Sequence, residues 1–195
     1  GFQLQDKLTE SIVGEVVTKL EQAEIDVHRR ALPGELDAYS RVMRGTSSLY
    51  EWTPAAIDAA LAQYQLALAV EPEFALAYAM MSYCHVQRQS FGLLVDPSRE
   101  AAEGAKLAWR ATELGKNDAH VLSRAAHAVS VLGRDLGSGM SLVDQAIALN
   151  PNLPAAWYVR GWIRIWRGDA REALADLDRA RCLSPYDRLV VQDRC

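Results

Sequence analysis

Apolar residues recur every three to four positions over long stretches of the chain, which is the spacing of one face of an α-helix. Over residues 3–30 this spacing predicts one long amphipathic helix, which ends before the turn signal Leu32-Pro33-Gly34. Shorter stretches of the same periodicity follow, and none shows the alternation of a β-strand. Because the chain is also rich in Ala and Leu, which favour helix strongly, we predict an all-α protein.

Three helix ends in the sequence have the same pattern. The segments 63–72, 143–151 and 177–185 each read Ala, two residues, an apolar residue, one residue and Pro. Pro151 and Pro185 are 34 residues apart, which is the period of tetratricopeptide (TPR) repeats. A proline cannot continue a helix, so it ends each unit on schedule.

The chain resembles the TPR family most clearly over its last unit. With Pro154 as repeat position 1, Trp157 falls on the aromatic core position 4, Gly161 on the small position 8 and Ala173 on the small position 20. Small residues there let the two helices of a unit approach closely. Gly168-Asp169 is expected to form the turn between them, with Asp169 as the N-cap of the second helix.

The resemblance implies a right-handed α-solenoid of four units with an additional N-terminal helix within residues 1–35. In the third unit it puts Ser123 at the aromatic position and Gly139 at the second small position. The second unit carries an inter-helix insertion at 88–98, which we expect to fold back on the array; contact with a partner or a second copy is the alternative. The expected units are approximately 38–72, 75–118, 120–153 and 154–187, and a further helix begins within 186–194.

In the TPR family the first helices of the units line a concave groove, through positions 2, 5, 9, 12 and 13. In the last unit these are Ala155, Tyr158, Trp162, Ile165 and Trp166. Trp, Tyr and Arg dominate binding hot spots, so this stripe predicts a surface that anchors a peptide. Packing against neighbouring helices is the alternative. Further groove candidates on first helices are Tyr83, Arg124, Arg160 and Arg164.

Nothing in the sequence indicates catalysis, a metal or a cofactor. His120 and His127 share a helix face but are seven residues apart, which is not a usual spacing for metal ligands. Cys84 and Cys182 lack a nearby His and acid, so we expect small buried apolar residues. We therefore predict that the chain is not itself an enzyme.

Charge and composition exclude other classes of partner. The 195 residues carry a net charge of −4, whereas nucleic-acid binders of this size are normally basic. No apolar stretch reaches the roughly 18–20 residues that span a bilayer. An odd number of cysteines without CxxC pairs fits a reducing cytoplasm. Because the chain opens on Gly1, we expect it to be part of a longer protein.

A narrower resemblance concerns residues 2–25, FQLQDKLTESIVGEVVTKLEQAEI, followed by LDAY (36–39) and MRG (43–45). This arrangement is similar to the C-terminal TPR region of bacterial multidomain regulators whose output domain is a class III adenylate/guanylate cyclase or a winged-helix DNA-binding domain. The resemblance implies such a parent protein.

The sequence therefore predicts a regulatory module that binds a protein or peptide segment, which could be another domain of the parent chain or a second copy. A TPR module that senses a small ligand is the alternative from another class, and a purely structural spacer is a third.

Overall fold

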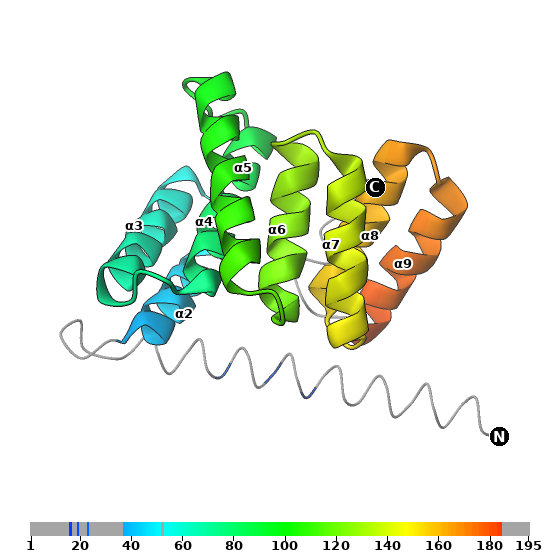
Figure 1. Cartoon of the computed structure of the whole chain (residues 1–195), viewed down its shortest axis with the longest axis horizontal. Helices are drawn as coiled ribbons and strands as arrows, with labels where there is room; N and C mark the ends of the chain where they lie inside the picture. The colour runs from blue at the N-terminus through cyan, green and yellow to red at the C-terminus, as the bar shows by residue number, and fades with distance from the viewer. Residues whose placement is uncertain (1–15, 17–18, 20–22, 24–36, 52, 185–195) are drawn as a thin grey trace.

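The computed structural model describes residues 37–51 and 53–184, together with the single residues 16, 19 and 23. The described residues form eight α-helices and no β-strand (Figure 1). Apart from those three residues, the predicted helix at 3–30 lies outside the described part of the chain, as does the one at 186–194. The helices are α2 (Ala38–Leu49), α3 (Pro54–Val70), α4 (Ala75–Ser90), α5 (Pro97–Leu114), α6 (Ala119–Val131), α7 (Leu136–Leu149), α8 (Pro154–Arg167) and α9 (Ala170–Leu183).

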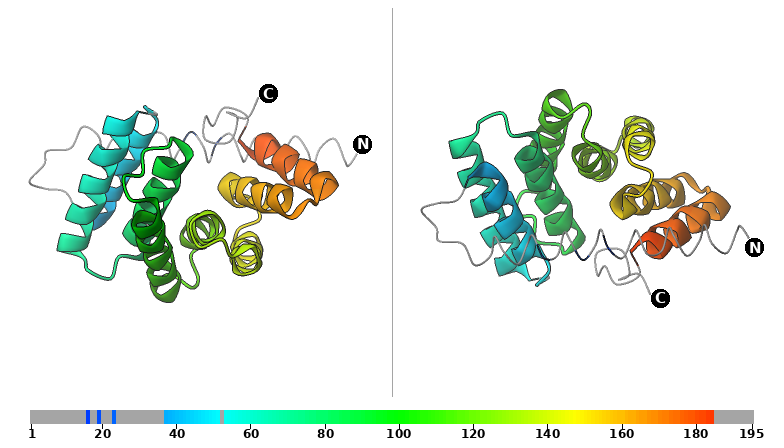
Figure 2. Two further views of the ribbon diagram at one scale, coloured as in Figure 1. Left: turned by 90° about the horizontal axis from the view of Figure 1, so that it is seen from above. Right: turned by 90° about the horizontal axis from the view of Figure 1, so that it is seen from below.

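The helices pack in consecutive pairs, and the pairs stack side by side into two layers (Figures 1 and 2). The first helices contact one another in the order α2, α4, α6, α8. Within the described residues the second helices contact first helices but not each other. The inner layer is therefore the more closely packed one and lines the concave side. The predicted fold class, an all-α helical repeat solenoid, is confirmed.

Small residues set the closest approach of the two helices of a pair. A Cβ added at Gly45 would lie 3.1 Å from the carbonyl oxygen of Ala60, and one added at Gly161 would lie 3.4 Å from that of Ala173. In the third pair the same contact joins Gly139 to the carbonyl of Ala126, at 3.0 Å. At Gly45 and Gly139 an added Cβ would press on the facing backbone, and at Gly161 it would meet the side chain of Leu177 at 2.8 Å, so the sequence keeps small residues at these points.

The contact between Gly139 and Ala126 corrects the register predicted for the third unit. Ala126 is the counterpart of Gly161 and therefore occupies the small position 8. The aromatic position 4 lies four residues earlier, so it falls on Leu122 and not on Ser123. Leu122 is buried in the core. The first helix of this unit is thus shifted by one residue relative to an alignment anchored on Pro151.

Polar side chains cap the starts of most of the helices. The carboxylates of Asp37, Asp96, Asp118 and Asp135 and the hydroxyl of Thr53 accept first-turn N–H groups. Gly168 makes the predicted turn at φ 87°, but the side chain of Asp169 does not cap α9 and instead pairs with Arg167 at 3.4 Å.

The insertion after α4 folds back only in part. Leu93 packs against the core, whereas Val95 is 90% exposed. Arg88 donates to the carbonyl of Leu93, and Glu100 accepts the N–H groups of Val95 and Asp96. The backbone of the loop is thus held by two side chains of neighbouring helices. No helix in the described part of the chain is long and apolar enough to cross a membrane.

The buried contact at Ala173 can be tested against an exposed position on the same helix. Ala173→Leu should lower the free energy of unfolding by about 1–3 kcal/mol, because the added atoms overpack the contact with α8. Ala175→Leu adds the same atoms at an exposed site and should stay within about 0.5 kcal/mol of the parent. Urea unfolding measures both, and equal stability of the two variants would show that the helix register is wrong.

Candidate concave groove

The inner layer carries a row of aromatic rings that crosses three helices. Tyr83 of α4, His127 of α6 and Trp162 of α8 each directly follow the small, buried residue of their helix, namely Ser82, Ala126 and Gly161. They occupy equivalent positions in three successive units. The row is therefore a consequence of the repeat, which turns the residue after each of these buried positions toward the groove.

The rings of this row lie in contact with one another. The ring centres of Tyr83 and His127 are 5.9 Å apart, and those of His127 and Trp166 are 6.1 Å apart with nearly parallel planes. Trp166 lies 5.9 Å from Trp162, whose ring meets that of Tyr158 edge-on at 6.3 Å. We call these five residues the aromatic row. Trp166 is its exposed member, with 41% of its surface accessible.

Arg124 covers the end of the row on α4. Its guanidinium carbon lies 4.3 Å from the ring centre of Tyr83, a cation–π distance. The amide of Gln87 donates to the hydroxyl of Tyr83 from the other side. These contacts bury Tyr83 almost completely. The cation of Arg124 itself makes no ion pair with any residue that the structure describes.

Two polar atoms within the row have no hydrogen-bond partner. They are the imidazole Nδ1 of His127 and the indole Nε1 of Trp162, both buried. Buried polar groups are normally paired, so an unpaired one costs about 1–3 kcal/mol and calls for an explanation. Burial, reinforced by the nearby charge of Arg124, lowers the pKa of His127 from 6.5 to about 3. The ring is therefore neutral at physiological pH.

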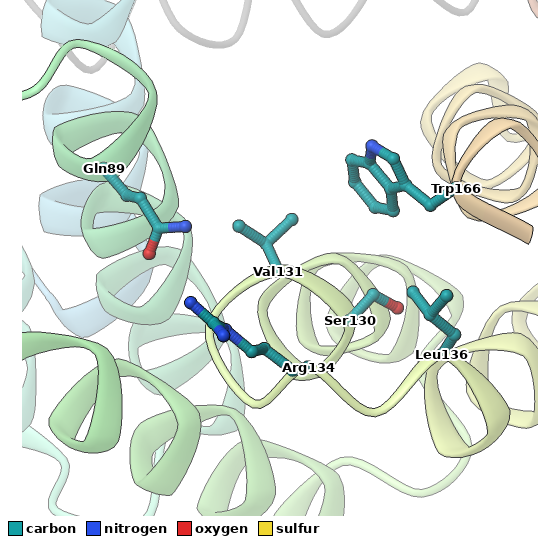
Figure 3. A pocket seen from close by; sticks show the side chains of 6 residues that line it. All are labelled: Gln89, Ser130, Val131, Arg134, Leu136 and Trp166. Carbon is teal, nitrogen blue, oxygen red and sulfur yellow. The ribbon is translucent and has the colours of Figure 1, made fainter. Parts of the chain in front are cut away.

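A pocket of about 430 Å³ opens beside the exposed end of the row. Figure 3 shows Trp166 on one side and Arg134 on the other, with Val131 and Ser130 on the floor between them. Arg134 has a left-handed backbone conformation, with φ 54°. The remaining lining residues are Gln89 and Leu136.

Arg160 and Arg164, the other arginines predicted for the groove, pair with carboxylates of neighbouring helices. Arg160 makes bonds of 2.8 and 2.9 Å to both carboxylate oxygens of Asp176 on α9, and also pairs with Asp144 on α7 at 3.0 Å. Arg164 binds Asp176 at 2.7 Å. Asp176 is buried, so the two cations balance a charge inside the array. Their role is structural.

Of the predicted groove residues, the structure brings Tyr83, Tyr158, Trp162, Trp166 and Arg124 into one connected set. Ile165 is 41% exposed on α8 but makes no ring contact in the row. Trp157 does not fill the core: it is half-buried, its indole donates to the carbonyl of Pro151, and Arg160 lies 4.6 Å from its ring centre. Tyr78 makes the equivalent bond to the carbonyl of Pro72.

Sequence reasoning missed His127 and Arg134 as groove residues. The alignment on Pro151 put His127 one position too early in its unit, at position 8, whereas the structure puts it at the groove position 9. Its spacing of three from Arg124 on one helix was the available signal. Arg134 lies in a loop, where repeat periodicity gives no signal.

The cysteines differ from each other. Cys84 is fully buried, and burial raises the pKa of its thiol to about 12, as suits an inert core residue. Cys182 is exposed on α9, so the prediction that it is buried was wrong. Among the described residues there is no cluster of three or more side chains that could hold a metal ion.

Comparison with known proteins identifies the fold. No protein-family model matches the chain, and no curated protein matches it. Among solved structures, TTC0263, a TPR protein of Thermus thermophilus, superposes with a TM-score of 0.67 at 18% identity, covering 94% of each chain. MamA gives a TM-score of 0.47 at 15% identity, covering 75% of this chain and 78% of that one. The superposition on TTC0263 shows that the chain has the fold of a TPR protein.

The low pKa of His127 predicts a specific loss of stability in acid. Between pH 6.5 and about 3 the unfolded chain binds a proton on this residue that the folded chain does not, so the free energy of unfolding falls by about 1.4 kcal/mol per pH unit. Gln cannot titrate. Between pH 7.5 and 5.0, urea unfolding should show that the parent loses about 2 kcal/mol more than His127→Gln.

His85 and His120, whose pKa values burial also lowers, are present in both chains and cancel in this comparison. Equal losses for parent and variant would mean that the ring of His127 is accessible to protons in the folded protein.

Proposed function

We propose that the chain is a protein-interaction module that binds an extended segment of a partner protein along its concave groove. The observation that carries the proposal is the continuous aromatic row across α4, α6 and α8. Aromatic side chains and Arg are the residues that contribute most binding free energy at interfaces.

The length of the row favours a peptide over a small molecule. Packed helices lie about 8–10 Å apart, so a row over three helices extends for roughly 20 Å. That is the length of about six residues of extended chain. The pocket beside Trp166 falls within the volume range of small-ligand sites, so a module that senses a small ligand is the second candidate. Such a ligand would reach only one end of the row.

The wider context of the chain is also a proposal. The stretch 2–25 followed by the repeats supports a multidomain regulator with a nucleotidyl cyclase as output domain, or a winged-helix relative. In that case the segment bound could belong to the parent chain. The gene that encodes the chain, sequenced in full, tests whether either output domain is present.

Two tryptophans of equal exposure provide the test of the groove. Trp166 is 41% exposed on the inner layer, and Trp109 is 44% exposed on α5 of the outer layer. A peptide selected against the chain from a displayed random library should lose at least about 2 kcal/mol of binding free energy with Trp166→Ala, as expected for an aromatic hot spot. Fluorescence polarisation measures the affinity.

Trp109→Ala is the matched control and should bind like the parent. Both variants should melt within a few degrees of each other, because each removes a partly exposed ring. Loss of binding in Trp109→Ala with binding retained in Trp166→Ala would place the site on the outer layer and contradict the proposal.

A further inference from the structure

Charge is divided between the two layers of the array. The inner helices α2, α4, α6 and α8 contain seven arginines and no Asp or Glu. The outer helices α3, α5, α7 and α9 contain eight acidic and six basic residues, so among the helices of the array the acidic side chains are confined to the outer layer. This division stands out because the whole chain has a net charge of −4. The helices that line the groove therefore offer cations and no carboxylate.

Most of these cations are already neutralised. Arg88 pairs with Asp58 at 2.6 Å and with Glu100 at 3.3 Å, and Arg167 pairs with Asp169. Arg160 and Arg164 share the buried carboxylate of Asp176. Arg124 differs from these four, since no carboxylate among the described residues lies within ion-pair distance of it. It lies at one end of the His127–Trp166 stack.

Arg134 is a second cation without a carboxylate partner in the described part of the chain, and it lines the same pocket as Trp166 (Figure 3). Its φ of 54° lies in the left-handed region, which disfavours residues other than Gly. The N–H of Asp135 holds the turn by donating to the carbonyl of Val129 at 3.2 Å. The Asp135 carboxylate accepts the N–H of Ser138 at the start of α7.

The spacing of the two cations sets a length for the ligand. The helix rises about 10 Å from residue 124 to the end of α6 at Val131, and Arg134 follows three residues later, so the backbones of the two arginines are about 10–15 Å apart along α6. An extended peptide covers this distance in about four residues, and its residues i and i+4 point to the same side. The aromatic stack between the cations suits a bulky apolar residue.

We propose that the groove selects a peptide with two acidic side chains four positions apart, one held by Arg124 and the other by Arg134, around an apolar residue on the His127–Trp166 stack. This inference rests on the proposed function and adds the chemistry of the ligand. Aromatic rows also bind cationic groups, but uncompensated arginines at both ends repel them. An acidic peptide with a central apolar residue can bind both the two arginines and the aromatic stack.

The probes are four labelled twelve-residue peptides of one sequence with Leu and Phe at its centre. They carry Glu at i and i+4, Gln at both, Lys at both, or Glu at i and i+3. Fluorescence polarisation should show the Glu i, i+4 peptide binding at least tenfold more tightly than the Gln and Lys peptides, and severalfold more tightly than the i, i+3 peptide. Its advantage should shrink between 50 and 300 mM salt, because salt screens exposed charges.

Arg124→Gln and Arg134→Gln should each weaken binding of the Glu i, i+4 peptide about fivefold or more and leave the Gln peptide unaffected. Arg99→Gln on α5 removes the same charge from an exposed outer-layer site and should change nothing. Thermal melts of all three variants verify that they are folded.

Equal binding of the Glu, Gln and Lys peptides, or unchanged discrimination in Arg124→Gln and Arg134→Gln, would overturn the proposal. If those peptides bind equally and Trp166→Ala abolishes binding, the groove functions but does not select acids. If none of the four binds, the acidic specificity is wrong, and the library-selected peptide tests the groove by itself.

Discussion

The closest approach of helices at small residues is the constraint on which the rest of the structure depends. A Cβ at Gly161 would lie 2.8 Å from two side-chain carbons of Leu177, and one at Gly45 would lie 2.6 Å from the ring of Tyr64. These distances leave no room for larger residues. The contact fixes the rotation of each inner helix about its axis, and therefore which side chain comes next on the concave face. His127 and Trp162 each follow such a contact, and Tyr83 follows the buried Ser82 at the equivalent position of its helix.

Ion pairs between the two layers add to the helix contacts that the small residues make possible. Acids on the outer helices reach inward to arginines on the inner helices, as Asp176 does to Arg160 and Arg164. Asp58 and Glu100 do the same to Arg88, which also holds the insertion after α4. The ion pairs thus lie between the layers, where they link neighbouring helices. On the groove side they leave a surface without carboxylates, which is where the unpaired Arg124 lies.

Much of this arrangement could be predicted from the sequence, because repeat periodicity is a local signal. The prolines at unit ends and the small residues at Gly161 and Ala173 were sufficient for the fold and for placing Trp162 and Trp166 on one face. The partners of Arg160 could not be predicted, since Asp176 is sixteen residues away and its direction depends on packing. The groove position of His127 was lost through a one-residue difference in helix register. Arg134 depends on a loop conformation for which periodicity carries no information.

The indole N–H of Trp162 reports most directly on whether the inner layer is the binding surface. It is buried without a hydrogen-bond partner, and its ¹H–¹⁵N resonance can be assigned with Trp162→Phe. Addition of the peptide with Glu at i and i+4 should shift this resonance and that of Trp166, and leave the indole resonance of Trp109 on the outer layer unchanged. A peptide that binds while shifting only the Trp109 resonance would contradict the account, because the aromatic row would then be packing and not a site.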